Sequence, residues 1–287
     1  MRYEAPQTLE AAARLLAESA GKARVLAGGT DLLVQIRSEI LEPEIVVDIK
    51  KISELRTVDE EPSRGFRIGA AVTGAELKEH KALKAMWPGV VEAANLIGST
   101  QVQGRATLGG NLCNGSPAAD SVPALIAAGA VASIVGVDGR RELAVEDIMI
   151  GPRKLALKPG EIVASFRLPP RPARSGDAYL RFIPRTEMDI AVVGAGVNLT
   201  LDAAGKITAA RVSLGAVAER PLLVAEAAAA IVGTTLDDAA LAKLSAAASA
   251  ACRPIDDKRG TKEFRIEVAG VMARRTAKIA YERARKV

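Results

Sequence analysis

The chain has 287 residues, of which 49% are hydrophobic and 25% are charged, and these proportions are typical of soluble globular proteins rather than of disordered ones. The length is long for one compact domain and suits two or three modest ones. The net charge is only +5, and 3% of the residues are aromatic. Because nucleic-acid binders usually combine a basic stripe with aromatic side chains for stacking, we expect no nucleic-acid partner.

Membrane and metal functions are not expected either. The chain has no apolar run long enough to span a bilayer, and its first residues lack the pattern of a signal peptide, so we expect a cytoplasmic protein. Two cysteines and one histidine are too few for a disulfide framework, a zinc site or an iron–sulfur cluster. We therefore expect no metal site in this chain.

The first elements are predicted to be a helix, a strand, a glycine turn and a second helix. Apolar residues at helical spacing follow Thr8 and stop before Gly21, which predicts an amphipathic helix. A short strand at 25–26 then runs into the glycines at 28–29. The residues after this turn predict a second helix with one apolar face, formed by Leu32, Leu33, Ile36 and Ile40.

Strand and helix patterns alternate in the next part of the chain. Residues 45–49 predict a buried strand, and residues 67–71 predict another. Thr73, with Glu76 three residues later, forms the pattern of a capping box for the helix that follows. This alternation predicts an α/β layer.

The pattern changes to hairpins at Asp138-Gly139, because that dipeptide favours a tight turn between two β-rich runs. Residues 161–168 predict a further strand. An irregular connection follows, where we expect a domain boundary, because the chain has prolines at 169, 170 and 172. An α+β domain is predicted beyond it, since alanine-rich helices follow three β-rich runs at 178–183, 190–201 and 206–217.

Two glycine turns are the main candidates for a functional site; their sequences are Ala27-Gly28-Gly29-Thr30-Asp31 and Thr107-Leu108-Gly109-Gly110-Asn111. Glycine allows a positive φ and a close approach to a ligand, so successive N–H groups can point at one anion. Thr30, Thr107 and Asn111 add side-chain donors, and the helix after Gly29 brings its positive end to the same place. Together the turns can hold a pyrophosphate, although each taken singly is also typical of an ordinary tight turn.

The second glycine turn leads into a long polar loop with prolines, at 113–123, and loops of this kind often serve a ligand. Within this loop, Asp120 has two interpretations that the sequence leaves open. Its carboxylate can accept hydrogen bonds from ribose or ribitol hydroxyls, or it can cap the helix that begins near Pro123.

A family resemblance rests on four segments, at 25–32, 107–125, 185–191 and 258–265. In order and spacing they resemble the flavin subunit of the xanthine dehydrogenase and carbon monoxide dehydrogenase family, and the likeness extends over nearly the full chain. It implies an α+β protein whose FAD-binding domain is of the vanillyl-alcohol-oxidase (PCMH) type, with FAD between two α/β subdomains. A C-terminal α+β domain, made of a three-stranded sheet and helices, is implied to cover the cofactor. The implied domains are 1–58, 59–172 and 173–287.

The resemblance also implies which residues bind FAD. It places the pyrophosphate against both glycine turns and their flanks, at Val25, Leu26, Ala27, Gly28, Gly29, Thr30, Asp31, Leu32, Thr107, Leu108, Gly109, Gly110 and Asn111. Asp120 is implied to hold a sugar hydroxyl, and Val163 to touch the adenine side. Arg181 stands where the animal xanthine enzymes have a lysine contact, a change that keeps the charge but alters the geometry. No catalytic residue and no metal ligand is implied.

Four further positions near the implied flavin are informative. Ile97 stands where the xanthine enzymes place an aromatic ring over the flavin, and Ile190 stands where carbon monoxide dehydrogenase has a tyrosine near it. Aliphatic side chains can fill this space, but ring stacking is lost. Arg185 and Asp189 resemble a charged pair that tunes the ring, and a surface salt bridge of little consequence is the alternative.

The function implied by the resemblance is that of an oxidoreductase subunit, which moves electrons from the [2Fe–2S] centres of a partner through FAD to NAD⁺, a quinone or a protein acceptor. The implied partners are a small [2Fe–2S] subunit and a large molybdopterin subunit, in a dimer of heterotrimers. We expect such a chain not to oxidise an organic substrate by itself. The alternatives are a stand-alone flavin reductase of the same fold, such as the enzyme that reduces enolpyruvyl-UDP-N-acetylglucosamine, and a nucleotide-binding scaffold without turnover.

Overall fold

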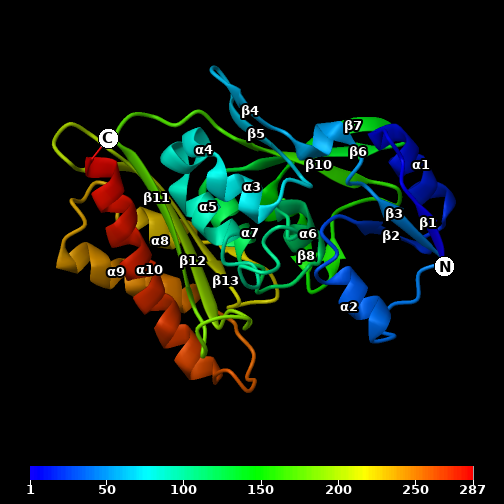
Figure 1. Ribbon diagram of the computed structural model, residues 1–287. Coiled ribbons are helices and arrows are strands. Elements are labelled where there is room, and N and C mark those ends of the chain that lie inside the picture. The colour runs from blue at the N-terminus through cyan, green and yellow to red at the C-terminus, as the bar shows by residue number, and fades with distance from the viewer. Residues whose placement is uncertain (287) are drawn as a thin grey trace.

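The computed structural model describes residues 1–286 and begins with a three-stranded parallel sheet (Figure 1). Its strand order is β1-β3-β2, with β1 at Arg2–Glu4, β2 at Ala23–Leu26 and β3 at Ile45–Asp48. Helix α1 (Leu9–Glu18) joins β1 to β2 and begins after Thr8, whose hydroxyl accepts a hydrogen bond from the backbone N–H of Ala11. The helix and the strand predicted for this segment are therefore confirmed.

Helix α2 (Leu32–Arg37) follows the first glycine turn but is shorter than predicted, and none of its residues is buried. It ends because Ser38 caps it and Glu39 takes a positive φ of 55°. Ile40 therefore lies outside the helix, and Leu33 and Ile40 are about half exposed. The apolar face predicted for this helix is thus not buried within the chain, and α2 projects from the body of the molecule (Figure 1).

The second sheet has five strands in the order β4-β5-β10-β6-β7, and every neighbouring pair is antiparallel. The strands are β4 (Val58–Glu61), β5 (Gly65–Gly69), β6 (Val131–Gly136), β7 (Gly139–Ala144) and β10 (Ile162–Leu168). The alternation of strands and helices predicts an α/β layer. The observed sheet is antiparallel instead, because two tight hairpins, β4–β5 and β6–β7, supply four of its strands. The hairpin predicted at Asp138-Gly139 is confirmed, since Gly136 pairs with Gly139.

Five short helices lie between β5 and β6 in the chain and pack on one face of the second sheet. They are α3 (Gly74–Glu79), α4 (Lys81–Met86), α5 (Pro88–Ala94), α6 (Leu108–Cys113) and α7 (Ser121–Ala127). The capping box predicted for Thr73 and Glu76 is present at the start of α3. Trp87, Phe66 and Phe166 fill the core between these helices and the sheet, while α1 covers the other face near Val135 and Ile162.

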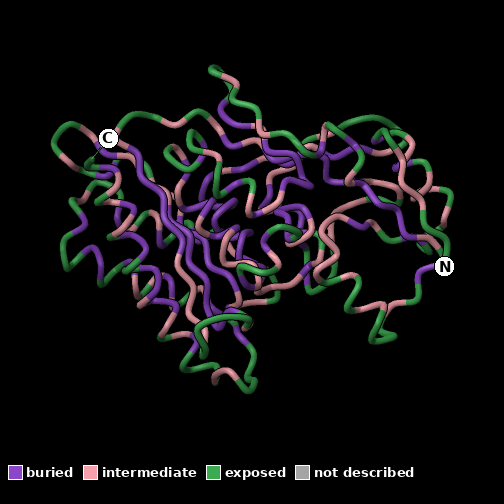
Figure 2. The backbone as a smooth tube through the Cα atoms, viewed as in Figure 1, coloured by how far each residue is buried: buried purple, intermediate pink, exposed green. Residues whose placement is uncertain are grey.

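The third sheet is antiparallel, with the order β11-β12-β13-β14. The three predicted β-rich runs form β11 (Ser175–Phe182), β12 (Val193–Leu201) and β13 (Ile207–Gly215), and the two residues Leu222–Leu223 add the short fourth strand β14. One face is covered by α8 (Ala225–Ala229), α9 (Asp238–Ala251) and α10 (Lys262–Arg285), and α5 and α7 contact the strands from the opposite side (Figure 1). Burial on both faces explains why these strands are buried along most of their length (Figure 2).

The mixed fold is completed by the small hairpin of β8 (Met149–Gly151) and β9 (Lys154–Leu155) and by 3-10 turns at Ser53–Arg56 and Val145–Asp147. No helix within residues 1–286 is both long enough and apolar enough to span a bilayer.

A buried ion pair joins the start of β11 to α5 and α10. The guanidinium of Arg171 lies 2.9 Å from the carboxylate of Asp177, and both side chains are less than one tenth exposed. The other carboxylate oxygen of Asp177 accepts a hydrogen bond from the N–H of Gly89 at 2.9 Å, and its carbonyl accepts one from Arg283, which also pairs with Glu92. Burial raises the pKa of Asp177 to about 6 and lowers the pKa of Arg171, so each charge depends on the other.

We predict that Asp177→Ala lowers the free energy of unfolding by about 3 to 5 kcal/mol, because it leaves the Arg171 charge buried without a partner. The matched control is Glu44→Ala, which removes the ion pair between Lys22 and Glu44, whose side chains are about 60% exposed. Such an exposed pair contributes only about 0 to 1 kcal/mol. Urea titration of both variants provides the measurement, and equal small losses would contradict a structural role for the buried pair.

Candidate functional site

The two predicted glycine turns lie against each other although they are far apart in the sequence. The first follows β2, and the second follows Arg105 and leads into α6. A Cβ added to Gly28 would overlap the backbone carbonyl of Arg105, so only glycine allows this approach. The side chain of Arg105 also donates a hydrogen bond to the carbonyl of Gly28 at 3.4 Å. The contact brings the two turns to one place.

The two turns differ in conformation. Gly29 has a φ of +80°, which explains the need for glycine there, whereas the other three glycines do not have a positive φ. The second turn is the first turn of α6, and Gly109 allows that helix to approach the backbone of Ala70, whose carbonyl accepts a hydrogen bond from the Gly109 N–H at 3.1 Å. The second turn therefore serves close packing and also lines the cleft.

The two turns also differ in whether their backbone N–H groups are bonded to the protein. The backbone N–H groups of residues 28–31 make no hydrogen bond to any part of the chain that the structure describes. In the second turn, the N–H groups of Gly109, Gly110 and Asn111 are all bonded to the protein, and the Gly110 N–H is bonded to the capping hydroxyl of Thr107 at 3.0 Å. Successive free N–H groups can bind an anion, so the first turn is the stronger candidate for anion binding.

Side chains around the turns are held by a local network. Asn111 accepts hydrogen bonds through its side-chain oxygen from the N–H and the hydroxyl of Ser121, at 3.1 and 2.7 Å, which leaves its amide NH₂ available. The side chain of Asn114 donates to Asp31 at 3.0 Å and accepts from Gln35 at 3.1 Å. This network ties the start of α2 to the end of α6.

A cleft of about 490 Å³ opens beside the two turns, a volume within the range of small-molecule and cofactor sites. Many residues predicted to bind a cofactor line it, namely Val25, residues 27–32, Ile97, Thr107, residues 109–111 and Val163. The predicted residues that do not line it are Leu26, Leu108, Asp120, Arg181, Arg185 and Asp189. Of these, Leu26 and Leu108 are almost fully buried, and Leu108 belongs to the core that packs on the second sheet.

Asp120 and Arg181 form a separate buried cluster. The carboxylate of Asp120 lies 2.7 Å from the guanidinium of Arg181 and accepts a hydrogen bond at 3.1 Å from the hydroxyl of Tyr179, a residue that sequence reasoning missed. The side chain of Asp120 makes no capping hydrogen bond to α7, which excludes the capping interpretation. Burial raises the pKa of Asp120 to about 6, against the opposing effect of Arg181.

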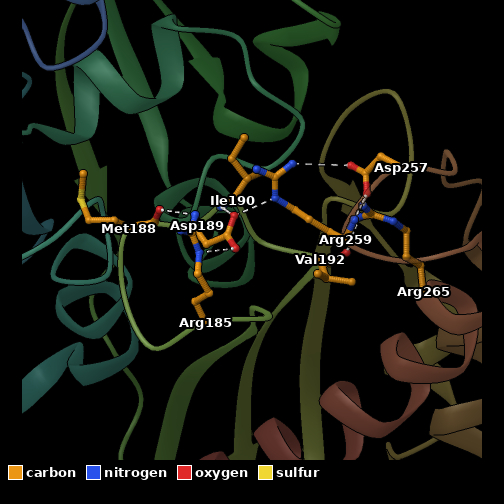
Figure 3. A network of polar contacts seen from close by, with 8 residues as sticks. All are labelled: Arg185, Met188, Asp189, Ile190, Val192, Asp257, Arg259 and Arg265. Carbon is orange, nitrogen blue, oxygen red and sulfur yellow. Dashed lines mark hydrogen bonds and ion pairs between the residues drawn. The ribbon is translucent and has the colours of Figure 1, made fainter.

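Arg185 and Asp189 belong to a larger charged network (Figure 3). The carboxylate of Asp189 is only 6% exposed and accepts hydrogen bonds from Arg185 at 3.2 Å, from Arg259 at 2.7 Å and from the N–H of Ile190 at 2.8 Å. Asp257 pairs with both Arg259 and Arg265, and Arg265 lies in α10. The bond from Arg259 is the main cause that lowers the pKa of Asp189 to about 2. Arg259 was not predicted from the sequence, because it lies 70 residues away.

This network holds the loop that joins β11 to β12, and the loop lies beside one end of the cleft. A Cβ on Gly98 would lie 3.9 Å from the sulfur of Met188, and Ile97 is the adjacent cleft residue. Met188 has a positive φ of 53°, and its side chain and that of Ile190 are more than half exposed. The charged pair therefore positions a loop with exposed apolar side chains near Ile97.

Sequence reasoning also missed Arg24 and Arg153, which line the cleft with Leu155 and Leu157. Their signal was weak, because neither arginine lies within a glycine turn. The structure brings them in through β2 and through the hairpin of β8 and β9. No group of three or more histidine, cysteine, aspartate or glutamate side chains suited to a metal ion is found within residues 1–286.

Comparison with known families defines the class of protein. Residues 1–171 match the family described as the FAD binding domain in molybdopterin dehydrogenase, and residues 178–280 match the CO dehydrogenase flavoprotein C-terminal domain. The chain is therefore a flavoprotein that binds FAD.

Individual relatives agree with both matches. The chain is 36% identical to the carbon monoxide dehydrogenase medium chain of Afipia carboxidovorans, covering 99% of this chain and 97% of that one. It is 31% identical to a putative xanthine dehydrogenase FAD-binding subunit of Escherichia coli, covering 95% and 93%. Among solved structures, a chain of the Cu,Mo-CO dehydrogenase superposes with a TM-score of 0.95 at 35% identity, covering 99% and 98%. The chain belongs to the family of FAD-binding subunits of molybdenum hydroxylases, and the resemblance found in the sequence is confirmed.

We predict that Arg259→Ala loosens the loop between β11 and β12, because Asp189 loses its main partner. The endoprotease Glu-C should then cleave the folded chain faster after Glu187, as measured by mass spectrometry of the fragments. The ion pair between Asp189 and Arg259 should also depend on pH. The pKa of Asp189 is about 2 in the folded chain, below the usual value of about 4. This pair should therefore stabilise the loop fully above about pH 4, and the stabilisation should be lost as the pH falls through the folded pKa.

Lys258→Ala is the matched control for this experiment, since it removes the neighbouring positive charge, which makes no ion pair within residues 1–286. Equal cleavage rates in the two variants would show that Arg259 does not hold the loop.

Proposed function

We propose that this chain moves electrons from the iron–sulfur centres of a partner subunit, through its bound FAD, to an external acceptor such as NAD⁺, a quinone or a protein. FAD, when bound, supplies the redox chemistry, because it exchanges electrons singly or in pairs. The main support is the row of free N–H groups at residues 28–31 in the wall of the cleft. They fit the charge of a pyrophosphate, which is the anionic part of FAD.

The lining residues suggest how the cofactor lies in the cleft. We assign the pyrophosphate to the first turn and to the amide of Asn111, the flavin ring to the end at Ile97, and the adenine to the end at Val163. Asp120 and Arg181 lie outside the lining, and each carboxylate oxygen of Asp120 accepts one hydrogen bond, from Tyr179 or from Arg181. Because a carboxylate oxygen can accept two, a sugar hydroxyl can bind Asp120 without replacing either bond.

The β11–β12 loop supplies the charges that we propose to act near the flavin. Asp189 is held by Arg259, while the Arg185 side chain is 68% exposed. Arg185 is therefore the member of the pair that can meet an acceptor. A positive charge near a redox ring favours its reduced, more negative form, so we infer that Arg185 favours reduction of the bound cofactor.

We also propose two partner subunits, a small one with [2Fe–2S] centres and a large one with molybdopterin, in a dimer of heterotrimers. The support is that two of the relatives are named as medium chains of carbon monoxide dehydrogenase, and this chain covers nearly their full length. Cys113 and Cys252 are the only cysteines, and two thiolates cannot supply the four that such a cluster usually needs. The partner must therefore hold the clusters.

We predict that Gly28→Val weakens FAD binding by about 10- to 100-fold, or about 1.4 to 2.7 kcal/mol, because the side chain separates the two turns. Flavin fluorescence during titration of the FAD-free chain gives the affinity, and circular dichroism shows whether the fold is retained. Gly104→Val is the matched control, since a Cβ added there meets no atom within 4 Å. Unchanged affinity in folded Gly28→Val protein would refute the assignment of the cleft.

We further predict that the purified flavoprotein alone does not oxidise aldehydes, purines or N-heterocycles, and that activity appears when the small and large subunits are added. Dye reduction by each mixture is the measurement. Reduction of the bound flavin by dithionite is the control, and its absence would favour a scaffold without turnover. Substrate-dependent dye reduction by the lone chain would instead support a stand-alone flavoenzyme.

A further inference from the structure

Arg153 occupies an unusual backbone position at the wall of the cleft. Gly151 pairs with Lys154 across the small hairpin, so Pro152 and Arg153 form its turn. Arg153 has a φ of +57°, in the left-handed region that favours glycine and disfavours residues with a side chain. Glycine would relieve the strain of this turn, yet arginine stands there. A strained conformation of this kind is typical of functional sites.

Contacts with the segment after α6 hold Arg153 in this position. Its backbone N–H donates a hydrogen bond to the carbonyl of Gly115 at 2.8 Å. Gly115 itself has a positive φ of 66°, and a Cβ added to it would lie 2.7 Å from the Cα of Arg153. The hairpin is therefore packed closely against the segment that begins with the second glycine turn.

The charges around the cleft make Arg153 distinctive. Four charged residues line the cleft, and three of them have partners within the protein. Glu161 pairs with Arg141 at 2.7 Å, Asp31 accepts a hydrogen bond from Asn114, and Arg24 donates to the backbone carbonyls of Gly21 and Ala23. Within residues 1–286, the guanidinium of Arg153 makes no hydrogen bond or ion pair. Of the two arginines that line the cleft, Arg153 is thus the one whose guanidinium donors are all free for an anionic ligand.

We propose that the guanidinium of Arg153 binds the pyrophosphate of FAD together with the free N–H groups of the first glycine turn, which line the same cleft. This inference rests on the proposed assignment of the cleft as the FAD site. A planar guanidinium can donate two hydrogen bonds to one phosphate group. Its positive charge also balances the negative charge of a pyrophosphate in a cleft that Asp31 lines as well. The proposal also explains why a strained turn carries arginine instead of glycine.

The decisive variant is Arg153→Gly, because it removes the guanidinium and relieves the strain of the turn. We expect the FAD-free variant to unfold at the same temperature as the original chain or higher, and to bind FAD about 10- to 100-fold more weakly. Arg153→Lys should retain part of the affinity. Lys154→Ala, which removes the next positive charge outside the cleft lining, should leave binding unchanged.

Titrations of the full chain with FAD at low and high ionic strength identify the group that Arg153 contacts. If it binds phosphate, the affinity difference between the original chain and Arg153→Gly should shrink as salt screens the charges. A difference independent of salt indicates stacking on the adenine ring and overturns the phosphate assignment. Normal FAD affinity in Arg153→Gly overturns the whole inference, provided that Gly28→Val has lost binding. If Gly28→Val also binds normally, the assignment of the cleft itself has failed.

Discussion

The contact between the backbone of Gly28 and the carbonyl of Arg105 positions everything else in the cleft. It joins a loop after the parallel sheet to the segment that begins α6, across 77 residues of sequence. A side chain at position 28 would separate them. Because the two segments touch, the free N–H groups of the first turn, the amide of Asn111 and the hairpin with Arg153 all line one space.

The two glycine turns share a motif but have different physical roles. The first uses the positive φ of Gly29 and leaves several N–H groups without a protein acceptor. The second begins a helix, uses its N–H groups internally and packs against Ala70. An anion is therefore best placed at the first turn, while the second provides a rigid wall and a side-chain donor.

Buried and half-buried charges connect both ends of β11 to neighbouring segments. Arg171 and Asp177 lie where the chain enters β11, and Arg283 of α10 joins them. At the other end of β11, Arg259 holds Asp189 and fixes the loop beside Ile97. These contacts are directional and need specific partners, unlike the apolar packing between the sheets and helices. They therefore determine where the β11–β12 loop and α10 lie relative to the third sheet.

The sequence by itself determined the features that depend on residues close together in the chain. The Thr8 cap, the Thr73–Glu76 capping box and the turn at Asp138-Gly139 are local patterns, and the segments of the family resemblance predicted the FAD-binding family. Only the tertiary structure decided that the second sheet is antiparallel, that α2 is exposed, and that Asp120 is enclosed by Tyr179 and Arg181. The roles of Arg153 and Arg259 likewise depend on contacts between distant segments, and no local pattern encodes which distant residues will meet.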